Sequence, residues 1–159
     1  MQMDLALLGL RLTLGSIFIV HACDKFGLES IWLLWELDNW PTYFSQAIIP
    51  FAAIIGDLFP FLDTTQAFWL ALITASIELI AGWCLVLGLA SRVAGLLLTL
   101  IMGVAIYFHF PQGFYGSDGG YEWAMLCLGG SQAIMLLGEG NFSLSALVRA
   151  VSTEQSRSI

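Results

Sequence analysis

The fold is decided by residues 67–89, which read AFWLALITASIELIAGWCLVLGL and carry one formal charge, at Glu78. A transmembrane helix needs about 20 mostly apolar residues, and this stretch meets that length. Three further stretches of the chain are comparably apolar, namely residues 5–23, 93–110 and 121–138. The sequence therefore predicts four membrane-spanning helices.

The composition of the chain also indicates a lipid environment. Hydrophobic residues make up 58% of the 159 residues and charged residues 11%, whereas soluble domains carry about 25% charged residues. So few charges cannot cover the surface of a soluble domain of this size. The formal net charge of −7 also argues against nucleic-acid binding, which requires clustered Lys and Arg. The composition thus argues against a soluble enzyme, a nucleic-acid binder and a disordered chain.

Short connections join the last three predicted spans, at residues 90–92 and 111–120. Short connections place neighbouring helices antiparallel. We therefore expect an all-α fold in which residues 1–140 form an integral membrane four-helix bundle. The segment between the first two spans, residues 24–66, is predicted to be an elaborated outer loop, and residues 141–159 a cytoplasmic amphipathic tail.

The outer loop (residues 24–66) is rich in acids and tryptophans, and amphipathic aromatic side chains favour the membrane–water boundary. Its apolar stretch, residues 43–62, contains Pro50, Asp57 and Pro60. Proline interrupts helical hydrogen bonding, and Asp57 would be stranded in lipid. We expect an interfacial or re-entrant pair of short helices here, and a fifth span is the alternative.

Basic residues are concentrated on one side of the predicted bundle. Four spans place the N-terminus, the 90–92 turn and the tail together, with Arg92, Arg149 and Arg157, whereas the opposite side holds Lys25. Cytoplasmic loops of membrane proteins carry an excess of Lys and Arg. The sequence therefore predicts that both termini are cytoplasmic.

Two charges, Arg11 and Glu78, lie inside predicted spans. Charges within spans are costly and usually face a partner. At about 1.5 Å of rise per residue, counted from the span ends, the two lie at similar depths in a core about 30 Å thick. We predict that Arg11 pairs with Glu78, either only to fix the helix register or as a redox, proton-relay or ligand-binding site.

A second polar group gathers at the outer ends of the spans and consists of His21, Lys25, His109 and Glu122. Histidine titrates near physiological pH, so His109 beside Glu122 could relay protons or hydrogen-bond a quinone carbonyl. One alternative is a collar of interfacial polar residues, and another is a metal or haem held by the two histidines. Because three cysteines without a CxxC pattern indicate no zinc site, we expect no metal centre.

Four motifs follow one another along the chain: LLGLRLTLGSIFIVHACDKF (7–26), IELIAGWCLVLGLASR (77–92), HFPQGFY (109–115) and GGYEWAMLCL (119–128). In order and spacing they resemble the DoxX family of small four-helix bacterial membrane proteins. The resemblance implies a multi-pass protein of the bacterial cytoplasmic (inner) membrane. Because the family is named through a membrane thiosulfate:quinone oxidoreductase, it also implies quinone-linked redox activity, although it implies the fold more firmly than the activity.

Three hypotheses for the function follow. The first is a quinone-interacting component of a membrane oxidoreductase. The sequence has no nucleotide-binding, c-type haem or iron–sulfur motif, so the electron carrier would be a quinone or a cofactor of a partner protein. Its catalytic candidates are Arg11, Glu78, His109 and Glu122, and its candidate quinone contacts are His21, Lys25 and His109. The second is a non-catalytic accessory subunit that packs against a larger respiratory or photosynthetic complex through the outer loop and lipid-facing helix surfaces. The third is a small transporter or proton pathway.

Overall fold

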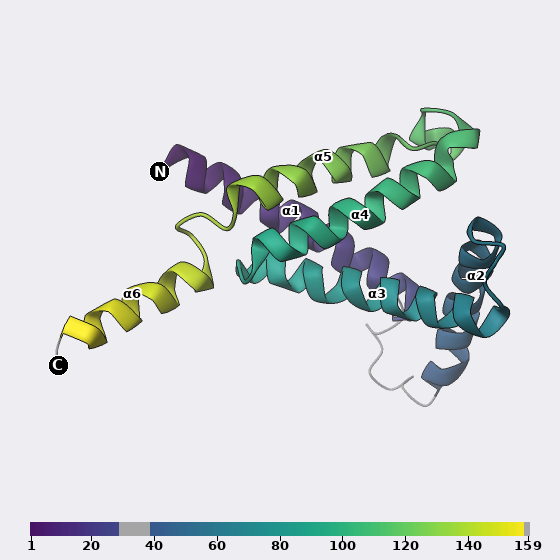
Figure 1. Ribbon diagram of the computed structural model, residues 1–159, viewed down its shortest axis with the longest axis horizontal. Coiled ribbons are helices and arrows are strands. Elements are labelled where there is room, and N and C mark those ends of the chain that lie inside the picture. Colours follow the sequence, from purple (N-terminus) through teal and green to yellow (C-terminus); the bar gives the residue numbers. More distant parts are fainter. Residues whose placement is uncertain (29–38, 158–159) are drawn as a thin grey trace. The chain divides into compact units, whose positions relative to one another are not determined.

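A computed structural model describes residues 1–28 and 39–157 of the protein, and its regular elements there are all helical (Figure 1). The prediction of an all-α fold is thereby confirmed for the described residues. In chain order the elements are α1 (Gln2–Lys25), α2 (Trp40–Leu58), α3 (Thr64–Leu87), α4 (Ser91–His109), the 3₁₀ turns η3 (Phe110–Gln112) and η4 (Gly116–Asp118), α5 (Glu122–Leu137) and α6 (Leu144–Arg157).

Three of these helices are long and apolar enough to cross a membrane: α1, α3 and α4 extended by η3. The protein is therefore a helical membrane protein. The fourth predicted span also forms a helix, α5, but its 16 residues cover only about 24 Å. A bilayer core is about 30 Å thick, so a fourth crossing stays a prediction.

The chain divides into two units, one formed by Met1–Ser16 with Ala81–Ile159 and the other by Ile17–Ile80. In the first unit, small residues let helices approach closely. A Cβ placed on Gly15 would lie 2.8 Å from the carbonyl oxygen of Gly82, and one placed on Gly95 would lie 2.8 Å from that of Ser131. Glycine at these positions therefore allows α1 to approach the end of α3, and α4 to pack along α5.

The connection between α3 and α4 begins at Gly88, two residues before the predicted 90–92 turn. Gly88 has a φ of 68°, its N–H donates to the carbonyl of Leu85, and the N–H of Leu89 donates to that of Cys84. This pair of hydrogen bonds is the Schellman arrangement that ends helices at a left-handed glycine. Gly88 therefore fixes the end of α3.

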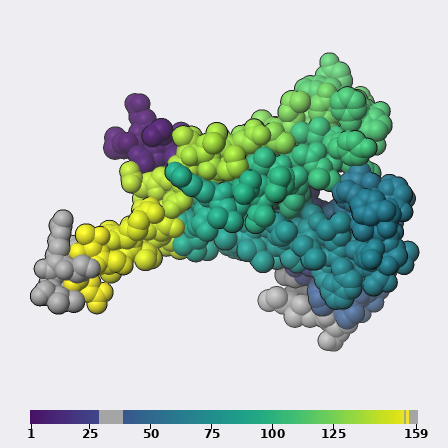
Figure 2. Space-filling model, viewed as in Figure 1, coloured from purple at the N-terminus to yellow at the C-terminus, as the bar shows by residue number. Residues whose placement is uncertain are grey.

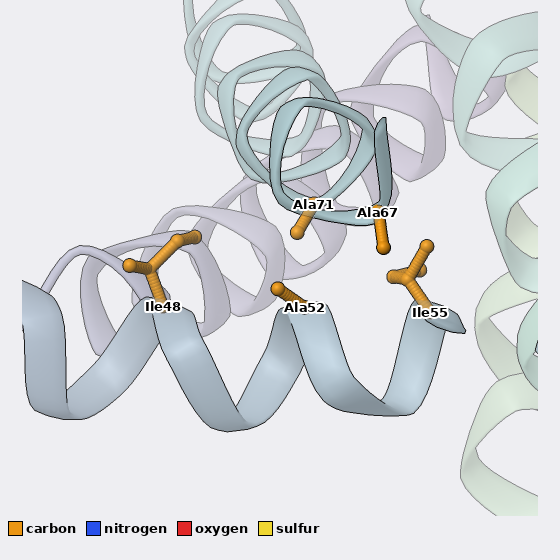
Figure 3. Close-up of a cluster of buried hydrophobic side chains, with 5 residues drawn as sticks. All are labelled: Ile48, Ala52, Ile55, Ala67 and Ala71. Carbon is orange, nitrogen blue, oxygen red and sulfur yellow. The ribbon is translucent and has the colours of Figure 1, made fainter. Parts of the chain in front are cut away.

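In the second unit, α2 packs on the first half of α3. Ile48, Ala52 and Ile55 lie on one face of α2 and contact Ala67 and Ala71 of α3 (Figure 3). These positions recur at helical spacing, so one stripe of α2 is buried. This packing holds α2, which lies in the predicted outer loop, against the first half of α3.

The prediction of two short helices in this loop is wrong, because α2 is one continuous helix with Pro50 inside it. Proline within a helix costs about 3 kcal/mol or more, and the buried stripe around Pro50 offsets this cost. The helix ends at Leu58, shortly before Pro60, because the residue before a proline disfavours helical backbone. The predicted interfacial tryptophans Trp32 and Trp35 lie outside the described residues.

Candidate functional site

Glu78 is the buried acid of α3. The whole residue is 2% exposed, and Ala71 and Ala75 on the same helical face are fully buried. Their positions, seven and three residues before Glu78, place all three on one side of α3. The small alanine side chains leave space for a neighbouring helix next to the carboxylate.

The partner of Glu78 is Lys25, the last residue of α1. Lys25 Nζ forms an ion pair with Glu78 Oε2, and the side chains are 18% and 3% exposed, respectively. Lys25 Nζ also lies 4.7 Å from the ring centroid of Phe51 on α2, a cation–π contact. One residue from each of α1, α2 and α3 therefore meets at this place, which we call the Lys25–Glu78 site.

Two contacts hold α2 next to Lys25. Trp40 Nε1 donates a hydrogen bond of 3.1 Å to the carbonyl of Phe26, and the rings of Phe26 and Phe44 stack with their centroids 6.3 Å apart. The chain therefore fastens the start of α2 directly to the residue that follows Lys25. These contacts fix the position from which Phe51 reaches the ammonium group.

Chemically, the Lys25–Glu78 site combines a hydrogen-bond donor and an acceptor inside a membrane protein. The ammonium group can donate hydrogen bonds to a carbonyl oxygen, and the carboxylate can accept a proton. His21, one turn before Lys25 on α1, is exposed. His21 therefore lies on the same helix as Lys25, but the packing that encloses the ion pair does not cover it.

The predicted Arg11–Glu78 pair is wrong in its partners. Arg11 is fully buried, but its Nη2 donates to the carbonyl oxygen of Phe142, while Glu78 pairs with Lys25. The guanidinium group also lies against Gly88. Along α3, Glu78 precedes Gly88 by ten residues, or about 15 Å of helical rise. Hydropathy sets the end of the span only approximately and does not fix this register, so similar predicted depths did not identify the partner of Glu78.

Arg11 belongs to a clasp between α1 and the loop after α5. In this clasp the backbone N–H of Asn141 donates to Asp4 Oδ1 at 3.0 Å. Beside it, Ser145 Oγ at the start of α6 donates to the carbonyl of Gly88, which follows α3, at 2.9 Å. The Nε and Nη1 atoms of Arg11 have no hydrogen-bond partner within residues 1–28 and 39–157. Arg11 therefore positions the C-terminal loop, a role that hydropathy alone did not indicate.

His109 and Glu122 each bind the backbone of the connection between α4 and α5. His109 Nδ1 lies 2.8 Å from the carbonyl oxygen of Gly119, and Glu122 Oε2 accepts a 2.9 Å hydrogen bond from the N–H of Gly116. The structure thus places the two predicted relay residues on one connection, where each holds a different backbone group.

The sequence left open a metal centre as an alternative for the polar side chains. Within the described ranges, 1–28 and 39–157, no group of three or more His, Cys, Asp or Glu side chains could hold a metal ion. The three cysteines are free thiols, and Cys127 is buried.

The fold and this site define a small helical membrane protein with an ion pair largely enclosed among its helices. The DoxX family model matches residues 6–111, and the chain belongs to the DoxX family. Comparisons with curated proteins and with solved structures give no match. The matched range contains both Lys25 and Glu78 and ends before Glu122.

Proposed function

We propose that this protein is the membrane component of a quinone-linked oxidoreductase and that the Lys25–Glu78 site contacts the quinone. The observation that carries the proposal is the ion pair itself, in which a carboxylate with a 3% exposed side chain meets an ammonium group. Buried charges in membrane segments are costly and commonly mark proton or substrate pathways.

The residues of the site fit the chemistry of a quinone. A bound quinone would supply two-electron redox chemistry coupled to two protons. Lys25 Nζ would donate a hydrogen bond to a carbonyl oxygen, and the Glu78 carboxylate would accept a proton as hydroquinone is oxidised. Phe51, already in contact with Lys25 Nζ, offers an aromatic surface beside these groups. The electrons would pass to or from a partner subunit.

The proposal gives different roles to the other candidates from the sequence. Arg11, His109 and Glu122 have backbone partners, and we assign them to holding loops. His21 is exposed one turn from Lys25 and would exchange protons between the site and water. Catalysis would therefore depend on Glu78 and Lys25 before any other residue.

The proposed setting is the bacterial cytoplasmic membrane, with both termini in the cytoplasm. Arg92 and Arg149 support this orientation because both belong to the groove at the start of α4, and basic residues favour the cytoplasmic side. Partner subunits would dock on the outer loop and on lipid-facing helix surfaces.

The experiment measures quinone binding to the purified full chain in detergent, through quenching of tryptophan fluorescence by decylubiquinone and by a short-chain menaquinone. We expect saturable quenching that is weakened at least tenfold in Lys25→Met and in Glu78→Gln. The matched control is Glu122→Gln, which removes a carboxylate that binds loop backbone and should leave the affinity unchanged. Equal affinities in all four proteins would refute the proposal, and a loss only in Glu122→Gln would move the site to the α4–α5 connection.

A second candidate function is a non-catalytic accessory subunit, and the exposed face of α3 favours it. This face carries large apolar side chains at helical spacing, namely Trp69, Ile73, Ile80, Trp83 and Leu87. Such a face can pack against another membrane subunit as well as against lipid, and the ion pair would then serve only to join helices. Purification in mild detergent separates the two candidates. A stoichiometric complex with another membrane protein, together with a quinone affinity that Glu78→Gln leaves unchanged, supports the accessory role.

A further inference from the structure

A groove of about 420 Å³ lies at the start of α4 and is lined also by the end of α5, the loop that follows it and Arg149 of α6. Its polar side chains include Arg92, Glu139 and Arg149, and its apolar ones include Val93 and Leu137. All of these residues belong to the first unit of the chain. The groove is separate from the Lys25–Glu78 site and has no part in the function proposed above.

The charges in the groove favour an anion. Arg149 Nη1 lies 3.2 Å from Glu139 Oε1, and the Arg149 side chain is 64% exposed, so its guanidinium group can still donate to a ligand while its charge is balanced within the groove. Within residues 1–28 and 39–157 the guanidinium group of Arg92 forms no hydrogen bond or ion pair, so the groove holds one positive charge in excess. Arg92 is also the second residue of α4, and the N-terminus of a helix attracts anions.

A glycine keeps the space beside Arg92 open. Gly138 has a φ of 84°, and a Cβ on this residue would lie 3.0 Å from Arg92 Nε. A larger residue would therefore be strained in its backbone and would press on the guanidinium group. The loop conformation after α5 and the position of Arg92 thus depend on each other.

Apolar surface continues from the groove along α4, which is one of the helices long enough to cross a membrane. Val93, Leu96 and Leu100 are 59%, 45% and 61% exposed and share one face of the helix at spacings of three and four residues. A molecule bound at Arg92 would therefore have an apolar face beside it on which hydrocarbon chains could lie.

The neighbouring helix α6 has the features of a membrane-surface helix. Its apolar side chains Leu144, Leu147, Val148 and Val151 are all exposed, and they recur at helical spacing on one face. Figure 2 shows the visible face of α6, in yellow, uncovered by other helices. Such a helix lies in the headgroup region of a bilayer, so the groove beside Arg149 would face lipid headgroups.

We infer that the groove binds the phosphate of an anionic glycerophospholipid, with Arg92 and Arg149 as its ligands. The acyl chains run along the exposed face of α4 that begins at Val93. Basic pockets at the ends of membrane helices bind such headgroups. A free phosphate ion shares the charge chemistry but would make no use of the apolar face.

The test compares the thermal stability of the full chain in detergent supplemented with phosphatidylglycerol, phosphatidylcholine or inorganic phosphate. We expect phosphatidylglycerol to raise Tm in a saturable manner, with little effect from the other two. Arg92→Gln and Arg149→Gln should each weaken the apparent affinity for phosphatidylglycerol about fivefold. The control is Arg157→Gln, which removes the same charge at the last residue of α6 and should leave the affinity unchanged.

Three results would overturn the inference. Equal stabilisation by phosphatidylcholine would show that the headgroup charge is not read, and equal stabilisation by inorganic phosphate would show a site for the free ion. A loss in Arg157→Gln as large as that in Arg92→Gln would show attraction by overall charge. Because Arg149 is largely exposed, its variant should fold even where Arg92→Gln does not, and an unchanged affinity in Arg149→Gln would exclude this residue as a ligand.

Discussion

Replacing Lys25 with methionine should destabilise the protein more than replacing Glu78 with leucine. Lys25→Met leaves a carboxylate whose side chain is 3% exposed without its cation, whereas Glu78→Leu leaves an ammonium group that is 18% exposed and keeps Phe51. Breaking one partner of a buried pair costs about 3–5 kcal/mol in protein interiors, and polar contacts between membrane helices are worth about 1–2 kcal/mol. We expect Lys25→Met to lower the free energy of unfolding by about 3–5 kcal/mol and Glu78→Leu to lower it by about 1–2 kcal/mol.

The double variant Lys25→Met/Glu78→Leu provides the decisive comparison. Replacement of a buried ion pair by hydrophobic side chains of similar volume is often neutral or stabilising, so the double variant should recover most of the loss seen in Lys25→Met. The assay is thermal or denaturant unfolding of the purified full chain in one detergent, followed by circular dichroism. If the two single losses simply add in the double variant, the residues do not form the energetic pair described here.

Two further predictions concern α4 and α2. Gly95→Ala should lower the Tm of the protein because its Cβ would lie 2.8 Å from the carbonyl oxygen of Ser131. The control is Gly103→Ala on the same helix, whose Cβ would have no atom within 4 Å and which should be neutral or stabilising by up to about 1 kcal/mol. Equal losses of Tm in the two variants would contradict the close packing of α4 on α5. Cysteines placed at Ser45 and Thr64 in a cysteine-free background should react with an impermeant thiol reagent from the same side of the membrane, because α2 is predicted not to span it, and labelling from opposite sides would require a fifth span.

The ends of the membrane helices could be read from the sequence more closely than hydropathy allowed. The apolar run begins at Ala67, but α3 begins at Thr64. The backbone N–H of Gln66 donates to Asp63 Oδ1, and the N–H of Asp63 donates to Gln66 Oε1. This reciprocal pair is a capping box, and its residues lie in order in the sequence. Polar capping residues thus extend a membrane helix beyond its apolar run.

The partners in the candidate site could be predicted only in part. The sequence indicated that Glu78 needs a cation, because a lone buried charge is costly, but hydropathy could not fix the register that gave this role to Lys25. Phe51 was missed because its contact with Lys25 depends on the packing of α2, which contains a proline that argues against a continuous helix. The partners of Glu78 and Lys25 are therefore determined by packing between segments far apart in the sequence, which composition and predicted depth do not specify.

The clasp at Arg11 has a consequence for the order in which the protein is made. The carbonyl that accepts the hydrogen bond from Arg11 belongs to Phe142, which follows 131 residues later in the chain. During synthesis, α1 therefore enters the membrane with a guanidinium group whose final acceptor does not yet exist, and water or lipid phosphate must solvate it in the meantime. Arg11 can form its final hydrogen bond only after the loop that follows α5 has left the ribosome. Packing of the first helix is therefore completed only after the C-terminal segment has been synthesised.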